Sequence, residues 1–363
     1  MKADYLIVLL ITVSSFLSCE SPIEMGDDGL GEVLIMNAHI NTADTSHVVW
    51  LAYGTQHGMR STLDGVVSCF VNGKLVASTD KVVETYEKQT IDSFKNYISV
   101  AAYRFDAQIA PGDHVRIVAS AGPHLCQAEM DVLPRPTILD AYMFPCETDV
   151  DKQCGRNRFE IRIQDQDGVL NYYYLRLIGA SHIVVEKTAG LSSYNVGDVL
   201  ERKNKEVHIN TTGEPLLNTG ARFLGDQGSS QASYFDNEEN LFTDLLFRDG
   251  QYTIRVFTDE QFMNAPSTMD EGDSMIVYNM AIVRVFNISR EEYLSLSGYQ
   301  FANSRENGSF LTEEFVFPNN VEGGIGFVSV NTATDYVLYF PTRRVTIDTW
   351  PHGTVLEDDE VQL

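Results

Sequence analysis

The chain has 363 residues, with 51 acidic and 26 basic side chains and a formal net charge of −25. A pI near 4.5 argues against a nucleic-acid-binding protein, because phosphate groups require a basic surface, and against a polybasic patch for membrane lipids. The negative charge favours solubility, while 44% hydrophobic residues and this length predict a sizeable core in two domains.

The first 18 residues have the features of a lipoprotein signal peptide. Lys2 precedes a largely apolar run from Tyr5 to Phe16, and the segment ends in Leu17-Ser18-Cys19. The run is too short for a permanent membrane span, which needs roughly 20 residues. In lipoproteins such a thiol receives a diacylglycerol before the signal is cut, so we expect Cys19 to carry acyl chains such as palmitate. The alternative is a conventional secretory signal with an accidental cysteine near its end.

Residues 19–31 are polar and lack an apolar period, which predicts a flexible acidic tether. Glu20, Glu24, Asp27 and Asp28 give this tether the acidic start that surface-exposed lipoproteins often have, and they favour the outer face of the outer membrane. No later segment reaches the roughly 18 apolar residues of a membrane span, so we expect the rest to be soluble.

Residues 32–133 contain short β-strands separated by turns, without a helix. The clearest signal is a hairpin from Gly65 to Ala77, where Asn72-Gly73 fits a type I′ turn because both central residues need positive φ. About seven strands in about a hundred residues predict an Ig-like or transthyretin-like antiparallel β-sandwich. The two prolines within 133–136 have no backbone N–H to donate to a neighbouring strand, so this segment predicts a boundary between domains. The expected strands lie at 33–40, 47–53, 65–77, 97–103, 115–120 and 125–132.

Residues 137–345 are expected to form a second β-rich, sandwich-like domain with one short helix, followed by an acidic tail at 346–363. Within it, 187–240 is polar with weak periodicity, which predicts an irregular insertion. Ser289 can cap a helix from about 290 to 303, with the Glu292 side chain reaching back to the cap. The expected strands lie at 137–144, 158–164, 171–179, 241–247 and 251–258 (a hairpin), 275–286, 327–330 and 336–340.

Five cysteines leave four once Cys19 is assigned to lipid, and an oxidising compartment permits disulfides. Cys146 and Cys154 bracket a short polar loop, and we expect a local bridge that contributes about 2–3 kcal/mol. Cys69 and Cys126 lie in apolar alternations, so each is either a buried thiol or half of a second bridge. The cysteine and histidine spacings match no zinc motif, and we expect no metal or cofactor.

The order of several segments resembles a known family. These segments are Asn171-Tyr172-Tyr173-Tyr174, the residues 247–252, the residues 283–294 and the stretch from Phe317 to Gly326. Together they resemble the Bacteroidota lipoproteins of the family called domain of unknown function 4249, and the Asn-Val-Glu-Gly-Gly-Ile-Gly stretch is the most specific part. The resemblance extends over nearly the whole mature chain. It implies an outer-membrane lipoprotein encoded near TonB-dependent receptors, and it supplies no catalytic residues.

Two loops have the residue types of ion or phosphate sites. Asp165-x-Asp167-Gly168 has the spacing at which a calcium loop begins, but Arg176 stands where such a loop needs a bidentate glutamate, so a hairpin turn explains it better. The glycines of 323–326 lack the Lys-Ser/Thr partner and the helix of a phosphate loop. A backbone constraint, such as positive φ or close approach between chain segments, explains these glycines better.

No motif predicts an enzyme. The eight histidines are scattered, and neither a His-Glu-x-x-His nor a Gly-x-Ser-x-Gly motif occurs. Tyr172, Tyr173 and Tyr174 could offer a stacking surface for sugars, although alternation along a strand places part of the run in the core. The eight histidines are His39, His47, His57, His114, His124, His182, His208 and His352.

Three functions follow as hypotheses. The first is a non-enzymatic outer-membrane lipoprotein that assists a TonB-dependent transporter and binds a small molecule or peptide, with contacts expected in 187–240 and 146–154. The second is a surface adhesin or assembly subunit that uses exposed sheet edges. The third is an envelope hydrolase whose site is assembled in space from distant residues.

Overall fold

The structure of the protein is a computed structural model. It describes the greater part of the chain beyond the tether. The signal peptide, Cys19 and Cys154 lie outside the described residues, as do several loops. The described ranges are 32–55, 58–89, 97–146, 155–165, 168–188, 195–218, 237, 239–259, 273–303, 317–340, 343–346 and 356–357.

Strands dominate the described residues, which confirms a mainly β protein with one short helix. The α-helices among these residues are the single turn α3 (Pro215–Asn218) and the longer α4 (Arg290–Asn303). The predicted helix at about 290–303 is therefore confirmed. None of the described helices has the length and apolar character needed to cross a membrane.

The first half of the molecule, residues 32–133, is a sandwich of two sheets. Its core lies between them and includes Leu34, Met36, Tyr103 and Ile117, all fully buried. The predicted hairpin is confirmed, with φ of 52° at Asn72 and 77° at Gly73. One sheet has the order β5 (Lys74–Thr79), β4 (Gly65–Val71), β8 (His114–Ala121) and β9 (His124–Asp131). The other contains β1 (Val33–Asn41), β2 (Ser46–Thr55), β3 (Gly58–Ser61), β7 (Tyr97–Asp106) and β6 (Val82–Gln89).

The second half, from residue 137 onward, also packs one sheet against another. Tyr173, Phe159 and Phe242 are the largest buried side chains of its core. The smaller sheet has the order β10 (Thr137–Pro145), β11 (Asn157–Gln164) and β15 (Gln251–Thr258). The larger contains β13 (Val199–Val207), β12 (Tyr172–Lys187), β16 (Ser274–Ile288) and β17 (Val328–Tyr339), with the short strands β14 (Leu241–Thr243), β18 (Arg343–Thr346) and β19 (Leu356–Glu357) attached.

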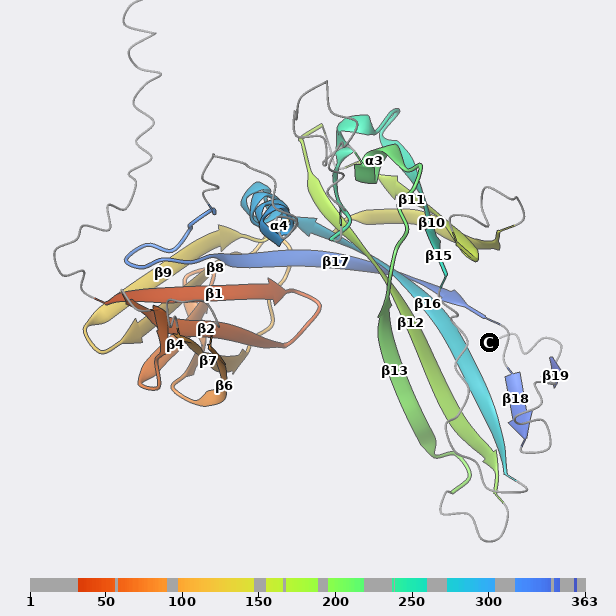
Figure 1. Ribbon diagram of the computed structural model, residues 1–363, viewed down its shortest axis with the longest axis horizontal. Helices are drawn as coiled ribbons and strands as arrows, with labels where there is room; N and C mark the ends of the chain where they lie inside the picture. The colour runs from red at the N-terminus through yellow and green to blue at the C-terminus, as the bar shows by residue number, and fades with distance from the viewer. Residues whose placement is uncertain are drawn as a thin grey trace, which may run out of the picture.

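A single strand, β17, joins the two halves (Figure 1). Its first residues pair in parallel with β1, from Ala38↔Val328 to Asn41↔Asn331, and its later residues pair with β16. The result is one 12-stranded sheet that runs through both halves. The prediction of two separate strands at 327–330 and 336–340 is therefore wrong. Val321, Val328 and Val330, which lie in the stretch assigned to the second domain, pack in the core of the first half.

Two other segments differ from the sequence-based expectation. The insertion at 187–240 is not irregular throughout, because β13 pairs with β12 along eight residues, from Leu177↔Val207 to Val184↔Val199. An edge strand tolerates charged residues, which hides its strand character in the sequence. The expected hairpin at 241–258 is confirmed only at its turn, where Asp249 and Gly250 have positive φ and Arg248 pairs with Gln251. The pairing of its two strands is wrong, because β14 pairs with β12 whereas β15 pairs with β11 in the other sheet.

Cys69 and Cys126 are buried free thiols, so of the two alternatives that the sequence leaves open the structure shows the buried thiols and not a second bridge. Strand β8 lies between them, because Cys69 is opposite Ile117 and Ala119 is opposite Cys126. Two strand spacings separate the cysteines by about 10 Å, beyond the roughly 7 Å Cα distance that a disulfide spans. Burial raises the pKa of both thiols to about 11, which keeps them unreactive at neutral pH. The predicted Cys146–Cys154 bridge involves a residue outside the described ranges.

Candidate functional site

The glycine-rich stretch that carries the family resemblance lies beside the first sandwich, directly before β17. On one side, Met36 N donates to Ile325 O and Ile325 N donates to Leu34 O, each at 2.9 Å. On the other side, Glu322 and Gln127 exchange two backbone hydrogen bonds of 2.7 and 2.9 Å. Met36 belongs to β1 and Gln127 to β9, which are strands of opposite sheets. The stretch 319–326, here called the signature loop, therefore links the two sheets of the first half.

Three glycines of the signature loop stand where no side chain fits. A Cβ on Gly326 would lie 2.0 Å from Met36 O, and its φ is +135°. A Cβ on Gly324 would lie 2.5 Å from Leu34 O, and one on Gly323 would lie 2.5 Å from Leu125 O. The prediction that a backbone constraint explains these glycines is confirmed, since the loop backbone lies directly against its neighbours.

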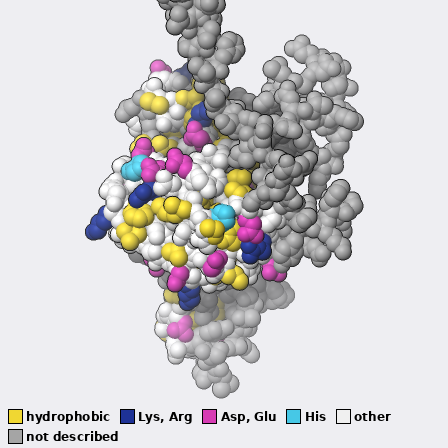
Figure 2. All heavy atoms as spheres, turned by 90° about the vertical axis from the view of Figure 1, so that its left-hand side faces the viewer, with side chains coloured by type: hydrophobic (Ala, Val, Ile, Leu, Met, Phe, Trp, Pro, Cys, Tyr) yellow, Lys and Arg dark blue, Asp and Glu magenta, His cyan; other side chains and the backbone are white. Residues whose placement is uncertain are grey.

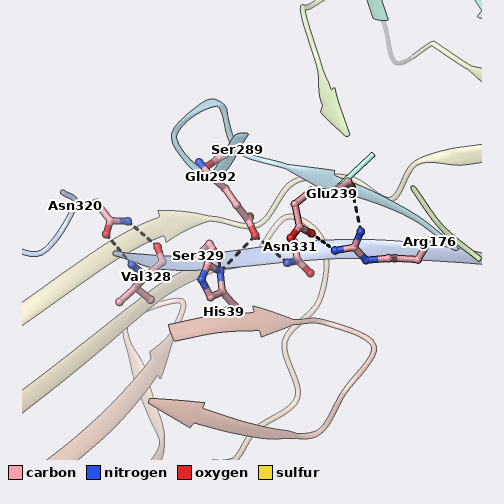
Figure 3. Close-up of polar contacts among 9 residues, drawn as sticks. All are labelled: His39, Arg176, Glu239, Ser289, Glu292, Asn320, Val328, Ser329 and Asn331. Atoms are coloured by element: carbon pink, nitrogen blue, oxygen red, sulfur yellow. Dashed lines mark hydrogen bonds and ion pairs between the residues drawn. The ribbon is translucent and has the colours of Figure 1, made fainter. Parts of the chain in front are cut away.

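Asparagine side chains hold the signature loop in shape. Asn319 Oδ1 accepts hydrogen bonds from Val321 N and Gly326 N, each of 3.1 Å. Asn320 accepts from Val328 N at 2.9 Å and donates to Val328 O at 2.7 Å, as Figure 3 shows. The loop is therefore fixed to the first residue of β17 by its own side chains.

Four polar side chains meet where α4 lies against β1 and β17, and we call His39, Glu292, Ser329 and Asn331 the junction cluster. Asn331 Nδ2 donates to Glu292 Oε1 at 3.2 Å, and His39 Nδ1 lies 3.6 Å from the same oxygen. His39 Nδ1 also lies 2.9 Å from Ser329 Oγ. Figure 3 shows the Glu292 side chain pointing from α4 toward β17, where it meets His39 and Asn331.

Glu292 departs from the role that the sequence predicts. The Ser289 cap is confirmed, because Ser289 Oγ accepts a 3.0 Å hydrogen bond from Glu292 N. The Glu292 side chain, however, turns into the junction cluster and is only 2% exposed. Its Oε2 and the Oδ1 of Asn331 have no hydrogen-bond partner among the described residues. Burying a carboxylate oxygen without a hydrogen-bond partner costs folding free energy. The contacts of Glu292 with His39 and Asn331 offset part of that cost.

The junction cluster lacks the geometry of a hydrolase triad. In such a triad the serine and the carboxylate bind opposite nitrogens of the imidazole ring. Here Ser329 Oγ and Glu292 Oε1 both lie beside Nδ1 of His39. The cluster therefore offers no nucleophile and base that are oriented by a separate acid.

Two further described histidines, His47 and His114, take part in local contacts. Buried His47 contacts Ala107 O through Nε2 at 3.0 Å. On the surface, a hydrogen bond to Asp131 at 2.8 Å raises the pKa of His114. His57 and His352 lie outside the described ranges. Within those ranges, no group of three or more His, Cys, Asp and Glu could hold a metal ion.

The tyrosine run is packed against other aromatic rings. Tyr173 is fully buried and stacks on Phe242 at 5.2 Å between ring centroids, as strand alternation predicts for part of the run. Tyr174 stacks on Phe286 at 4.0 Å. Tyr172 contacts the ring of Tyr293 from α4 at 5.1 Å. All three rings therefore contribute to packing between strands and helix.

Charged side chains near the tyrosines form ion pairs. Arg176, which excludes a calcium loop in the sequence, lies over the Tyr174 ring and pairs with Glu206 at 2.8 Å and with Glu239. Figure 3 shows the Glu239 contact. On the face drawn in Figure 2, acidic, basic and apolar side chains are interspersed.

Replacing Glu292 distinguishes a packed polar junction from an unimportant surface group. Glu292→Ala is expected to lower the free energy of unfolding by about 1–3 kcal/mol, because the Asn331 amide loses its buried partner. Glu292→Gln is expected to stay within about 1 kcal/mol of the wild type, since its amide can both accept from and donate to Asn331. Urea unfolding measures both values, and an equal loss in the two variants would contradict this account.

Comparison with known proteins identifies a family whose model covers most of the chain. A family model described as Domain of unknown function (DUF4249) matches residues 20–336. No curated protein matches. A solved structure named BspA_C_WT is 9% identical with a TM-score of 0.17, covering 87% of this chain and 98% of its own. The C-terminal domain of the AgI/II polypeptide BspA from Streptococcus agalactiae is 10% identical with a TM-score of 0.15, covering 85% and 99%. Scores this low carry no information on fold or function.

Proposed function

Because the chain belongs to the family described as domain of unknown function 4249, we propose that it is a non-enzymatic outer-membrane lipoprotein that assists a TonB-dependent transporter. It acts as an accessory subunit or as a substrate-binding partner. The observation that carries the proposal is the extent of the match, which begins at residue 20, directly after Cys19, and continues to residue 336. The sequence resemblance links such chains to lipid anchors and to receptor-associated genes.

The architecture supports a role as a rigid scaffold. One sheet continues through both halves by way of β17, and the signature loop ties the start of β17 to both sheets of the first half. Binding surfaces are commonly built from loops on such frames. A small molecule or peptide would then contact 187–240 and the 146–154 loop, as the sequence predicts. Much of both segments lies outside the described residues.

A surface adhesin or assembly subunit is the second candidate. Strands β13 and β6 stand at the two ends of the described path through the large sheet. An exposed edge strand can accept a strand from another chain. Ordered multimers in native preparations would favour this function over the first.

Affinity purification tests the transporter role. A C-terminal tag on the chain, solubilised from membranes in mild detergent, is expected to recover a TonB-dependent transporter. The same tag on a Cys19→Ala variant is the matched control and is expected to recover much less, since that chain no longer shares the membrane. Recovery of a lone monomer from wild-type membranes would contradict the proposal.

A further inference from the structure

The small sheet of the second half carries aromatic and charged side chains on the face that points away from the core. In its three strands, buried residues alternate with residues that point outward, as the pleat of a β-strand requires. The strands β10 and β11 lie at the upper right of Figure 1. The side chains here called the outer face are Tyr142 and Phe144 of β10, Arg158, Glu160 and Arg162 of β11, and Arg255 of β15.

Two aromatic rings of the outer face lie side by side at the surface. The ring centroids of Tyr142 and Phe144 are 6.2 Å apart, with 31° between the ring planes. Tyr142 is 54% exposed and Phe144 is 37% exposed, and neither belongs to the core of the second half. The Arg158 guanidinium lies over the Phe144 ring, 5.2 Å from its centroid. Packing in the core therefore does not explain this aromatic pair, and exposed apolar groups that lie together commonly mark a binding surface.

Charged side chains occupy the positions beside Tyr142 on the neighbouring strand. Glu160 is directly opposite Tyr142, and Arg162 is its diagonal neighbour, at the roughly 7–8 Å that long side chains can reach. Glu160 Oε1 accepts hydrogen bonds of 3.1 and 3.3 Å from Arg255. Arg162 donates to Asp140 Oδ2. These contacts hold planar hydrogen-bonding groups next to the aromatic pair.

The outer face is rich in arginine, although the chain has a net charge of −25. Its three arginines outnumber the carboxylates of Glu160 and Asp140. The side chains of Arg162 and Arg255 are 44% and 59% exposed. A guanidinium has five N–H donors, and a single carboxylate engages only part of them, so such an arginine can also bind a carboxylate from solution. An anionic ligand therefore meets complementary charge on this face.

We propose that the outer face binds an acidic oligosaccharide, a glycan whose sugar rings carry carboxylate groups. The apolar C–H face of a sugar ring packs on the exposed rings of Tyr142 and Phe144, which supply a flat apolar surface. Arg162 and Arg255 pair with the sugar carboxylates, because the guanidinium fork matches carboxylate geometry. Glu160 accepts hydrogen bonds from sugar hydroxyl groups. This ligand would be the substrate of the proposed substrate-binding partner, so the assignment rests on the proposed function.

Calorimetric titration of the full chain, purified in detergent, tests the proposal with three probes. These are an oligomer of galacturonic acid, a neutral oligomer of glucose of the same length, and an oligomer of glutamate of the same length. The galacturonic acid oligomer is expected to bind at least about tenfold more tightly than the other two, because it alone offers both sugar rings and carboxylates. Its affinity is expected to fall as salt rises, since exposed charge pairs are screened.

Tyr142→Ala is expected to weaken binding of the galacturonic acid oligomer by about tenfold, because an exposed ring at the centre of the face is lost. Tyr142→Phe keeps the ring and is expected to stay within about threefold of the wild type. Tyr86→Ala is the matched control, since it removes a 49% exposed tyrosine from β6 in the first half. It is expected to leave the affinity unchanged.

Arg162→Gln tests the carboxylate contact separately from the aromatic contact. It is expected to weaken binding of the galacturonic acid oligomer by about tenfold and to leave that of the neutral oligomer unchanged. Arg60→Gln is the matched control, because Arg60 is 58% exposed and also forms an ion pair, with Glu32. Exposed ion pairs contribute little to stability, so both variants are expected to remain folded.

Several results would overturn the proposal. They are no binding of the galacturonic acid oligomer, equal binding of the neutral or the glutamate oligomer, and equal losses in Tyr142→Ala and Tyr86→Ala. Dimers of the wild type that Tyr142→Ala dissociates would show that a second copy occupies the outer face, and they would overturn it too.

Failure of glycan binding is distinguishable from failure of the transporter role. If titration fails while a transporter is still recovered with the tagged chain, the assignment of the outer face is wrong and the accessory role stands. If the purified chain binds the glycan as predicted and no transporter is recovered, the proposed partner is wrong and the outer face remains a glycan-binding site.

Discussion

Gly326→Ala is expected to lower the free energy of unfolding by about 3–5 kcal/mol, among the largest effects of a single methyl group. The new Cβ would lie 2.0 Å from Met36 O and 3.0 Å from Asn37 Oδ1, so the backbone must move. That movement would break the hydrogen bond from Phe327 N to Asn37 Oδ1, now 2.8 Å, and those between Ile325 and β1. Both the positive φ and the lost contacts contribute to the expected destabilisation.

Gly73→Ala is the matched control for this substitution. Gly73 also has a positive φ, of +77°, but a Cβ there would have no atom within 4 Å. Its replacement is expected to cost only about 1–2 kcal/mol, from the backbone conformation alone. Urea unfolding of both variants gives the comparison. Equal losses would mean that the signature loop does not approach β1 as closely as the structure indicates.

Cys19→Ala is expected to move the protein from the membrane fraction to the soluble fraction. Each buried methylene of an acyl chain contributes about 0.8 kcal/mol, so roughly two or three chains hold a protein durably on a bilayer, whereas an unmodified tether does not. Cell fractionation followed by immunoblotting measures the change. Cys69→Ala removes a buried thiol instead and is expected to leave the protein on the membrane. Retention of the Cys19→Ala chain at the wild-type level would contradict lipid anchoring.

The local structure could be predicted from the sequence because local chemistry determines it. Asn72-Gly73 adopts the positive φ values that a two-residue hairpin needs, and Ser289 caps α4 through its side chain. The signature glycines were correctly assigned to a backbone constraint, since Gly326 has a strained φ and a close neighbour. Each of these features depends on residue types within a few positions of one another.

The contacts that unite the molecule could not be predicted in this way. The parallel pairing of β17 with β1 joins residues such as Ala38 and Val328, and no short-range pattern encodes which distant strand a segment will meet. Glu292 has the spacing of a capping residue, yet its side chain is drawn to Asn331 on β17. Such contacts are set by tertiary packing.

The most specific part of the family resemblance has a structural role. Asn320 binds the first residue of β17, Val321 enters the core of the first half, and Gly324 lies against the backbone of β1. These residues fix the signature loop to β1, to the start of β17 and to the core of the first half. The family pattern thus has a structural explanation, and the proposed function depends on the expected lipid anchor, the proposed partner and the loops.

The central claim is that this protein works from a membrane through lipid on Cys19. Mass spectrometry of the N-terminal peptide, taken from protein extracted from cell membranes, tests it most directly. We predict that the mature chain begins at Cys19 and carries the added mass of a diacylglycerol, with or without a further acyl group. A mature chain with an unmodified cysteine, or one that begins at another residue and is recovered from the soluble fraction, would contradict the claim.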